Sequence, residues 1–294
     1  MRATAVIVVL AVLAANAHAG IEVIRDVEYG QGGGHRLLLD IVRPNPAPSN
    51  ALPAVIFIHG GAWRAGDKYG APVRFLAEHG YFTASINYRL SMEAPFPAAV
   101  EDCKCAVRWL RANAGKYNID PDHIGVWGAS AGGHLAEFLG TTADDARYEG
   151  TGGWTNESSR VNAVVSFFGP SDFMSGIGKF HNEDGSRGNF DVVKFLGGLP
   201  DERPDVYRAA SPITHVSKES APMLLVHGDQ DPVVPLEQSA HMAEALKAAG
   251  AEVKFVVVTN GVHGFFINRL LPISPRPAQI QGAVLQWFDT HLRP

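Results

Sequence analysis

Apolar residues along this chain fall into short continuous runs separated by longer amphipathic stretches. The runs, which are typical of strands buried on both faces, lie at residues 54–58, 81–86, 124–127, 161–168, 222–227 and 252–258. Helical patterns alternate with them, at residues 71–79, 97–113, 131–139, 237–249 and 277–292. From residue 54 onward this alternation predicts an α/β fold with a mostly parallel central sheet and helices on both faces.

Two regions depart from that alternation. Residues 21–29 and 36–42 are strand-like runs around the Gly-rich stretch 30–34, which predicts an N-terminal antiparallel hairpin at one edge of the sheet. Residues 171–212 are polar, contain Gly and Asp, and show no strand period. We expect them to form a small cap insertion with short helices over the carboxyl edge of the sheet, within one catalytic domain at 20–294.

The first 19 residues have the pattern of a secretory signal peptide. Arg2 precedes an apolar run from Ala3 to Ala15, and Ala17-His18-Ala19 stands before Gly20. Cleavage is expected near Ala19–Gly20, which predicts a secreted or periplasmic protein; the alternative is an uncleaved anchor. No later stretch has 18 uninterrupted apolar residues, so we expect no membrane span in the mature chain.

Composition narrows the class of protein only slightly. Hydrophobic residues make up 46% of the 294 residues and charged residues 19%, as in an ordinary soluble globular chain. The net charge of −5 argues against nucleic acid or an anionic membrane as a partner. Cys103 and Cys105 are two apart in an expected helix and cannot form an unstrained disulfide, so we expect two free thiols.

The first candidate for chemistry is Ser130, in the sequence Gly128-Ala129-Ser130-Ala131-Gly132. A buried strand precedes it and a helix of small residues follows it. Such a turn holds the central residue in a strained conformation, and the flanking glycines remove side chains that would clash. The pattern therefore predicts a nucleophilic hydroxyl above a helix N-terminus; the alternative is a Gly-rich turn with an incidental serine.

A serine nucleophile needs a base, and the base needs an acid that orients it. The order Ser, acid, His with each on a loop after a strand makes Asp229 and Asp231 the candidate acids, of which we favour Asp231 because Asp229 suits a turn. Among later histidines, His241 and His291 fall within helical patterns. His263 lies in a glycine-flanked loop after the last strand and is the expected base.

Attack on an ester carbonyl places negative charge on oxygen, which backbone N–H groups can stabilise. One donor is expected from Ala131, the residue after the nucleophile. The others are expected from Gly61 and Ala62, in the Gly-rich turn after the strand at 54–58. Each donor contributes roughly 3 kcal/mol in comparable sites. We expect His59 to brace this turn through a backbone hydrogen bond.

Together these motifs resemble the α/β-hydrolase esterase and lipase family, in particular the hormone-sensitive-lipase-like esterases and the bifunctional acetylxylan/feruloyl esterases. The matching motifs are His59-Gly60-Gly61-Ala62-Trp63, Gly66-Asp67-Lys68, Asn87-Tyr88-Arg89-Leu90, Gly128-Ala129-Ser130-Ala131-Gly132-Gly133-His134, His227-Gly228-Asp229-Gln230-Asp231-Pro232 and Val262-His263-Gly264-Phe265. The resemblance also favours Asp231, since the family's acid lies just before the proline. Ala62 departs from the His-Gly-Gly-Gly form, which makes bulky tertiary-alcohol esters less expected substrates.

The resemblance implies a serine carboxylesterase that acts through an acyl-enzyme and needs no metal or organic cofactor. Its expected substrates are short acyl, acetyl or feruloyl esters, as small molecules or linked to plant polysaccharide. An arylformamidase or exopeptidase-like hydrolase would use the same three residues, and a catalytically inactive binding module on this fold is a further alternative. The sequence does not indicate an oligomeric state.

Overall fold

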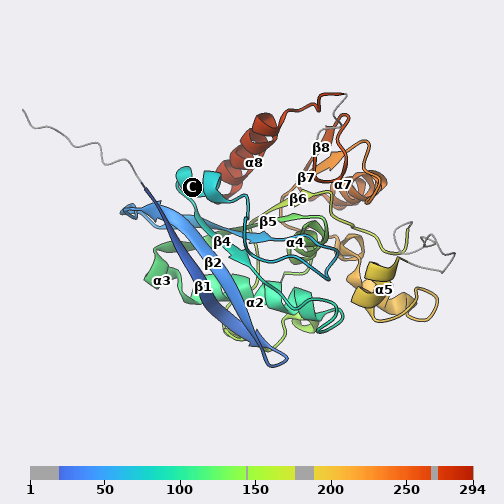
Figure 1. Ribbon diagram of the computed structural model, residues 1–294, viewed down its shortest axis with the longest axis horizontal. Coiled ribbons are helices and arrows are strands. Elements are labelled where there is room, and N and C mark those ends of the chain that lie inside the picture. Colours follow the sequence, from blue (N-terminus) through green and yellow to red (C-terminus); the bar gives the residue numbers. More distant parts are fainter. Residues whose placement is uncertain (1–19, 144, 176–188, 266–270, 294) are drawn as a thin grey trace, which may run out of the picture.

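A computed structural model describes residues 20–143, 145–175, 189–265 and 271–293, and the expected signal peptide lies outside them (Figure 1). An eight-stranded sheet runs through the molecule in the order β1-β2-β4-β3-β5-β6-β7-β8. The strands are β1 (Gly20–Gly32), β2 (His35–Asn45), β3 (Leu52–Ile58), β4 (Phe82–Ile86), β5 (Ile119–Ala129), β6 (Ala163–Phe167), β7 (Met223–Gly228) and β8 (Val253–Val258).

Pairing directions confirm the predicted sheet. In the spatial order β4-β3-β5-β6-β7-β8 each strand pairs with the next in the parallel sense, whereas β1 pairs with β2 and β2 with β4 in the antiparallel sense. The predicted hairpin is therefore the antiparallel edge of a mostly parallel sheet. Parallel strands end at one edge of the sheet, so the loops after β3, β5, β7 and β8 share that edge.

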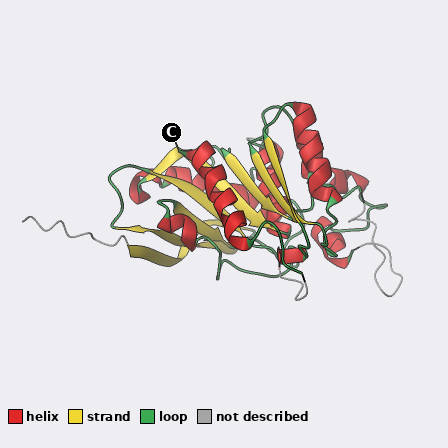
Figure 2. Ribbon diagram, turned by 90° about the horizontal axis from the view of Figure 1, so that it is seen from above, coloured by secondary structure: helices red, strands yellow, loops and turns green. Residues whose placement is uncertain are grey.

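Helices cover both faces of the sheet, as Figure 2 shows. One face packs against α2 (Ala98–Ala112), α4 (Ala131–Thr141) and α7 (Glu237–Ala249), and the other against α1 (Arg74–Glu78) and α8 (Pro277–Leu292). Within β3, Ile56 and Ile58 join the first apolar cluster while Val55 and Phe57 join the second. Burial on both faces explains why this strand is a continuous apolar run.

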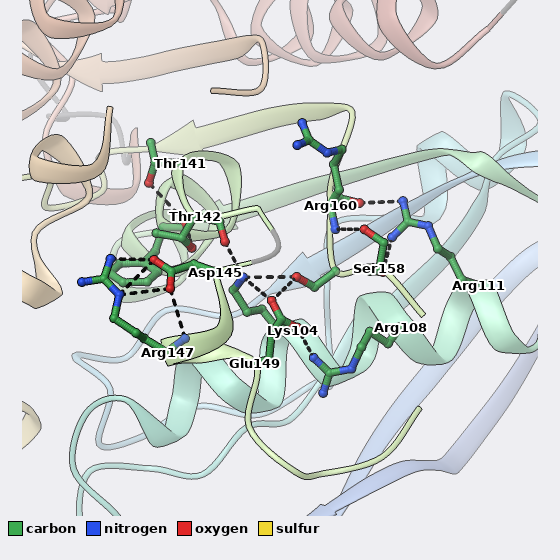
Figure 3. A network of polar contacts seen from close by, with 12 residues as sticks. Lys104, Arg108, Arg111, Thr141, Thr142, Asp145, Arg147, Glu149, Ser158 and Arg160 are labelled. Carbon is green, nitrogen blue, oxygen red and sulfur yellow. Dashed lines mark hydrogen bonds and ion pairs between the residues drawn. The ribbon is translucent and has the colours of Figure 1, made fainter. Parts of the chain in front are cut away.

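Helix α2 is buried more completely than its apolar pattern predicts. Besides the expected apolar residues, Lys104 and Arg108 are 0% and 1% exposed and both bind the carboxylate of Glu149 (Figure 3). Lys104 also donates to the carbonyl oxygen of Thr142 and to Ser159 Oγ, 3.1 Å away. This polar network fixes α2 to the segment that follows α4. Cys103 and Cys105 on the same helix are free, as predicted, and both are buried.

The segment predicted as a cap contains two helices in its described part, α5 (Phe190–Leu196) and α6 (Pro204–Ala210). Helix α5 lies against the loop that follows β3, because Phe195 stacks on Trp63 at 4.6 Å and Asp191 forms an ion pair with Arg64 at 2.9 Å. Phe173 and Phe195 are each 1% exposed and belong to the core.

Candidate active site

Ser130 occupies a strained turn between β5 and α4. Its backbone angles are φ 56° and ψ −122°, a region that residues other than glycine rarely adopt. A Cβ on Gly128 would lie 2.0 Å from the carbonyl oxygen of Gly132, and one on Gly132 would lie 2.1 Å from that of Ile58. Glycine is therefore required on both sides of the serine, which is the physical basis of the motif seen in the sequence.

The loops after β7 and β8 bring the expected acid and base to this turn. His263 Nε2 lies 3.0 Å from Ser130 Oγ, and His263 Nδ1 lies 2.7 Å from Asp231 Oδ2. Both distances are within the range of hydrogen bonds. The three side chains, 133 residues apart at the extremes, form one continuous hydrogen-bonded chain.

Asp231 is held in place by its own loop. Its Oδ1 accepts hydrogen bonds from the N–H groups of Val233 and Val234, at 2.8 and 2.9 Å, which leaves Oδ2 for His263. Burial opposes the charge of this carboxylate, but hydrogen bonds from His227, His263 and the two N–H groups outweigh it and hold the pKa of Asp231 well below its usual range. Asp231 is therefore ionised at neutral pH.

The candidates that the sequence did not favour lie outside this hydrogen-bonded chain. Asp229 stands at the end of β7, where its N–H donates to the carbonyl oxygen of Val258. His241 belongs to α7, and His291 to α8, where its Nδ1 bonds the carbonyl oxygen of Trp287. Among the candidate acids and bases, the structure therefore brings Asp231 and His263, the two favoured from the sequence, to Ser130.

The loop expected to supply oxyanion donors packs directly on the nucleophile turn. A Cβ on Gly60 would lie 2.7 Å from the carbonyl oxygen of Ala129 and 3.2 Å from Ser130 Cβ, so only bare backbone fits there. Gly61 and Ala62 have φ angles of 117° and 53°, and the Gly61 carbonyl accepts from the N–H groups of Arg64 and Ala65 in a tight turn. Ala131 begins α4, where N–H groups lack partners within the helix.

These positions are compatible with donation from Gly61, Ala62 and Ala131, whose role stays a prediction. His59 braces the turn as expected, with Nδ1 2.7 Å from the carbonyl oxygen of Gly60. Its ring stacks on Tyr88 at 4.4 Å.

Helix α4 carries two buried ionisable groups behind the serine. His134 bonds Trp63 Nε1 at 3.1 Å and the carbonyl oxygen of Ala210 at 2.8 Å, and burial lowers its pKa to about 4. Glu137 accepts from Ser166 Oγ at 2.6 Å and Ser171 Oγ at 2.7 Å. Burial raises the pKa of Glu137 to about 8, although both hydrogen bonds oppose that shift. These groups fix α4 and do not contact Ser130 Oγ.

The raised pKa of Glu137 predicts that the free energy of unfolding depends on pH. Between pH 4.5 and about 8 the unfolded chain ionises this carboxyl while the folded protein keeps its proton, so stability falls as pH rises through that window. Relative to Glu137→Gln, the wild-type protein should lose at most about 5 kcal/mol of unfolding free energy across it. Urea titrations of both proteins at the two ends measure the difference, and parallel pH dependences would refute the assignment.

A cavity of about 420 Å³ opens beside the catalytic candidates, between the sheet and the first half of α8. Ala129 and Gly264, the neighbours of Ser130 and His263 in sequence, both line it, so it lies next to the two reactive residues, which do not line it themselves. Its remaining lining residues are mainly aromatic or apolar, namely Phe57, Pro72, Trp127, Phe167, Phe168, Phe265, Pro277, Ile280, Gln281 and Val284. The sequence does not predict this cavity, because its walls come from separate strands and from the C-terminal helix.

The sequence also does not single out two further residues that lie beside the hydrogen-bonded chain of Ser130, His263 and Asp231. Phe168, directly after β6, places its ring 4.5 Å from that of His263. His227, in β7, is fully buried beside Asp231. The sequence signal for both is a position at the end of a buried strand, and His227 also begins one of the motifs that carry the family resemblance. Neither signal separates a site residue from core.

The mostly parallel sheet, the strained turn at Ser130 and the Ser–His–Asp chain at its carboxyl edge define an α/β-hydrolase. The model of the BD-FAE family matches residues 39–246, and the chain belongs to that family. This confirms the resemblance seen in the sequence.

Individual relatives agree with the family. Esterase LipC of Mycobacterium tuberculosis is 35% identical over 254 residues, which cover 82% of this chain and 59% of LipC. A structure described as a truncated form of carbohydrate esterase from gut microbiota has a TM-score of 0.76 at 33% identity and covers 94% of this chain and 98% of that one.

An acetyl ester-xyloside bifunctional hydrolase from Caldicellulosiruptor lactoaceticus has a TM-score of 0.70 at 27% identity, covering 86% of this chain and 88% of that one. The chain spans less than two thirds of the length of LipC.

Proposed function

We propose that this protein is a serine carboxylic ester hydrolase. The observation that carries the proposal is the hydrogen-bonded chain from Ser130 Oγ through His263 to the ionised Asp231. Such a chain has the polarity that a serine nucleophile requires: an imidazole nitrogen toward the hydroxyl and a carboxylate behind the imidazole. The relatives named esterases and carbohydrate esterases support the same conclusion.

The proposed reaction has two halves. Ser130 Oγ attacks the ester carbonyl while its proton passes to His263 Nε2, and the oxygen of the carbonyl becomes negative between the N–H groups of Gly61, Ala62 and Ala131. The bond to the alcohol then breaks, and the alcohol leaves with the proton from His263. Water repeats the attack on the acyl-enzyme, with His263 again as base, and releases the acid and free Ser130.

The aromatic cavity supports an apolar acyl group, and we propose feruloyl or similarly sized esters above acetyl esters. Its volume of about 420 Å³ is within the range of sites for small organic ligands, and an acetyl group would fill little of it. One similar structure is named an acetyl ester-xyloside bifunctional hydrolase, so acetyl esters of polysaccharide are the second candidate substrates.

Gln281 offers a test of this assignment, because it lines the cavity from an exposed position on α8. Gln281→Trp should lower kcat/KM for a feruloyl ester about tenfold relative to an acetyl ester, since the added ring occupies cavity volume. Gln286→Trp, at an exposed position on the same helix, is the matched control. Equal changes for both esters would exclude this cavity as the acyl site.

Kinetics on a panel of esters, aryl formamides and peptides separate the esterase from the alternative functions. Turnover of an aryl formamide or of a peptide above that of the esters would favour an arylformamidase or an exopeptidase-like hydrolase. The absence of turnover on every substrate, with the protein folded, would favour the inactive binding module.

We also propose that the protein is exported, on the strength of the pattern in residues 1–19. Within the described ranges, no helix is long and apolar enough to cross a membrane. N-terminal sequencing of the protein from culture medium or periplasm tests export: a start at Gly20 is expected, and a start at Met1 in the membrane fraction would indicate the anchor.

A further inference from the structure

A second histidine lies on the far side of Asp231 from His263. His227 is fully buried in β7, and its Nε2 is 3.4 Å from Asp231 Oδ2, the same oxygen that accepts from His263 Nδ1 at 2.7 Å. The same Nε2 lies 2.9 Å from the carbonyl oxygen of Val234. Its Nδ1 lies 2.7 Å from the hydroxyl of Ser239, on α7.

These partners determine which nitrogen of His227 carries the proton. A carbonyl oxygen and a carboxylate oxygen can only accept, so Nε2 must carry a hydrogen and share it between Val234 and Asp231. Ser239 is the one partner that can donate as well as accept. The neutral ring with its hydrogen on Nε2 therefore satisfies every partner, with Ser239 Oγ donating to Nδ1.

We propose that His227, locked by Ser239, is a positioning residue that shares Asp231 Oδ2 with His263 and so limits the negative charge that His263 experiences. The proposal rests on the proposed function, because it assigns a role in the same Ser–His–Asp chain. The contact at 3.4 Å is longer than the one at 2.7 Å, so His227 moderates the carboxylate and His263 remains its main partner.

The sign of the effect follows from electrostatics. Removing the donor at residue 227 concentrates the charge of Asp231 on His263, which favours the protonated imidazole. A protonated His263 cannot accept the proton of Ser130, so the acidic limb of the kcat/KM profile should move to higher pH. Among the described residues, the ionisable groups paired with Asp231 are His227 from β7 and His263 from the loop after β8, and Asp229 is two residues away on its own loop. Helix α7 contributes the hydroxyl of Ser239, which bonds His227.

Two substitutions of His227 separate the effect of its hydrogen bond to Asp231 from the effect of its packing. His227→Asn keeps an acceptor near the position of Nδ1 for Ser239 but has no atom at the position of Nε2. His227→Gln places an amide N–H near the position of Nε2 and can still donate to Asp231. We expect the titration midpoint of His263, followed by NMR of histidine-labelled protein, to rise by about half a unit or more in His227→Asn and to stay near the wild-type value in His227→Gln.

The acidic limb of kcat/KM should shift in the same direction as the NMR midpoint. Unchanged midpoints in a folded His227→Asn protein would overturn the proposal, and so would equal shifts in both variants, since those would indicate general disruption. If His227→Asn does not fold, Ser239→Ala provides a second readout in the same direction, because loss of the bond to Nδ1 releases the ring orientation that holds Nε2 beside Asp231 Oδ2. The NMR titration needs no turnover, so a protein without esterase activity would refute the proposed function and leave this measurement intact.

Discussion

Replacing Ser130 with alanine is expected to lower kcat on an activated ester about a millionfold. The change deletes the atom that forms the acyl-enzyme, and the remaining loop and cavity can only bind substrate and favour attack by water. Comparable removals of a serine nucleophile reduce turnover to the residual level supplied by the oxyanion donors. Burst and steady-state kinetics with a nitrophenyl ester measure both phases, and the variant should show no burst.

The fold should survive this change. The side-chain contact of Ser130 in the hydrogen-bonded chain is the one to His263, and alanine removes it without filling space. Thermal unfolding of the variant within a few degrees of wild type is the control. Esterase activity above a thousandth of the wild-type value would assign the nucleophile to another residue.

Replacing Asp231 with asparagine is expected to lower kcat about ten-thousandfold with the fold intact. The N–H groups of Val233 and Val234 hold Oδ1, so the asparagine keeps its oxygen there and turns its amide nitrogen toward His263. That nitrogen is a donor, so it favours the imidazole with its hydrogen on Nε2. The hydrogen then faces Ser130 Oγ, and the base is lost.

The neighbouring aspartate is the matched control. Asp229→Asn should keep kcat within a few-fold of wild type, because the side chain of Asp229 is not in the hydrogen-bonded chain from Ser130. Steady-state kinetics of both variants on one ester compare the two carboxylates directly. A large loss in Asp229→Asn together with a small loss in Asp231→Asn would reverse the assignment.

Much of this site was predictable from the sequence because its parts are local. The turn at Ser130 needs glycine at 128 and 132 for reasons visible within five residues, and the structure shows the clashes that any side chain would make there. Asp231 and His263 each follow a strand, and parallel strands place such loops at one edge. The helices at 237–249 and 277–292 have the predicted bounds.

The features that the sequence did not predict depend on contacts between distant segments. Lys104 and Arg108 fall on a polar pattern but are buried, because both pair with Glu149, which is 45 and 41 residues away in the sequence. Strand β5 begins at Ile119, five residues before the predicted start, because Ile119 pairs with Leu52. The polar residues between Ile119 and Ile124 interrupt the apolar pattern that would have indicated a strand. The same reason applies to the cavity and to His227, whose surroundings exist only in the assembled sheet.

The most direct test of the central claim is to trap the acyl-enzyme. The wild-type protein, mixed with a nitrophenyl ester and quenched in acid, should gain the mass of one acyl group, and peptide mapping should place it on Ser130. A fluorophosphonate should label the same residue and block acylation. An adduct on any other residue, or none while the ester is being hydrolysed, would contradict the account.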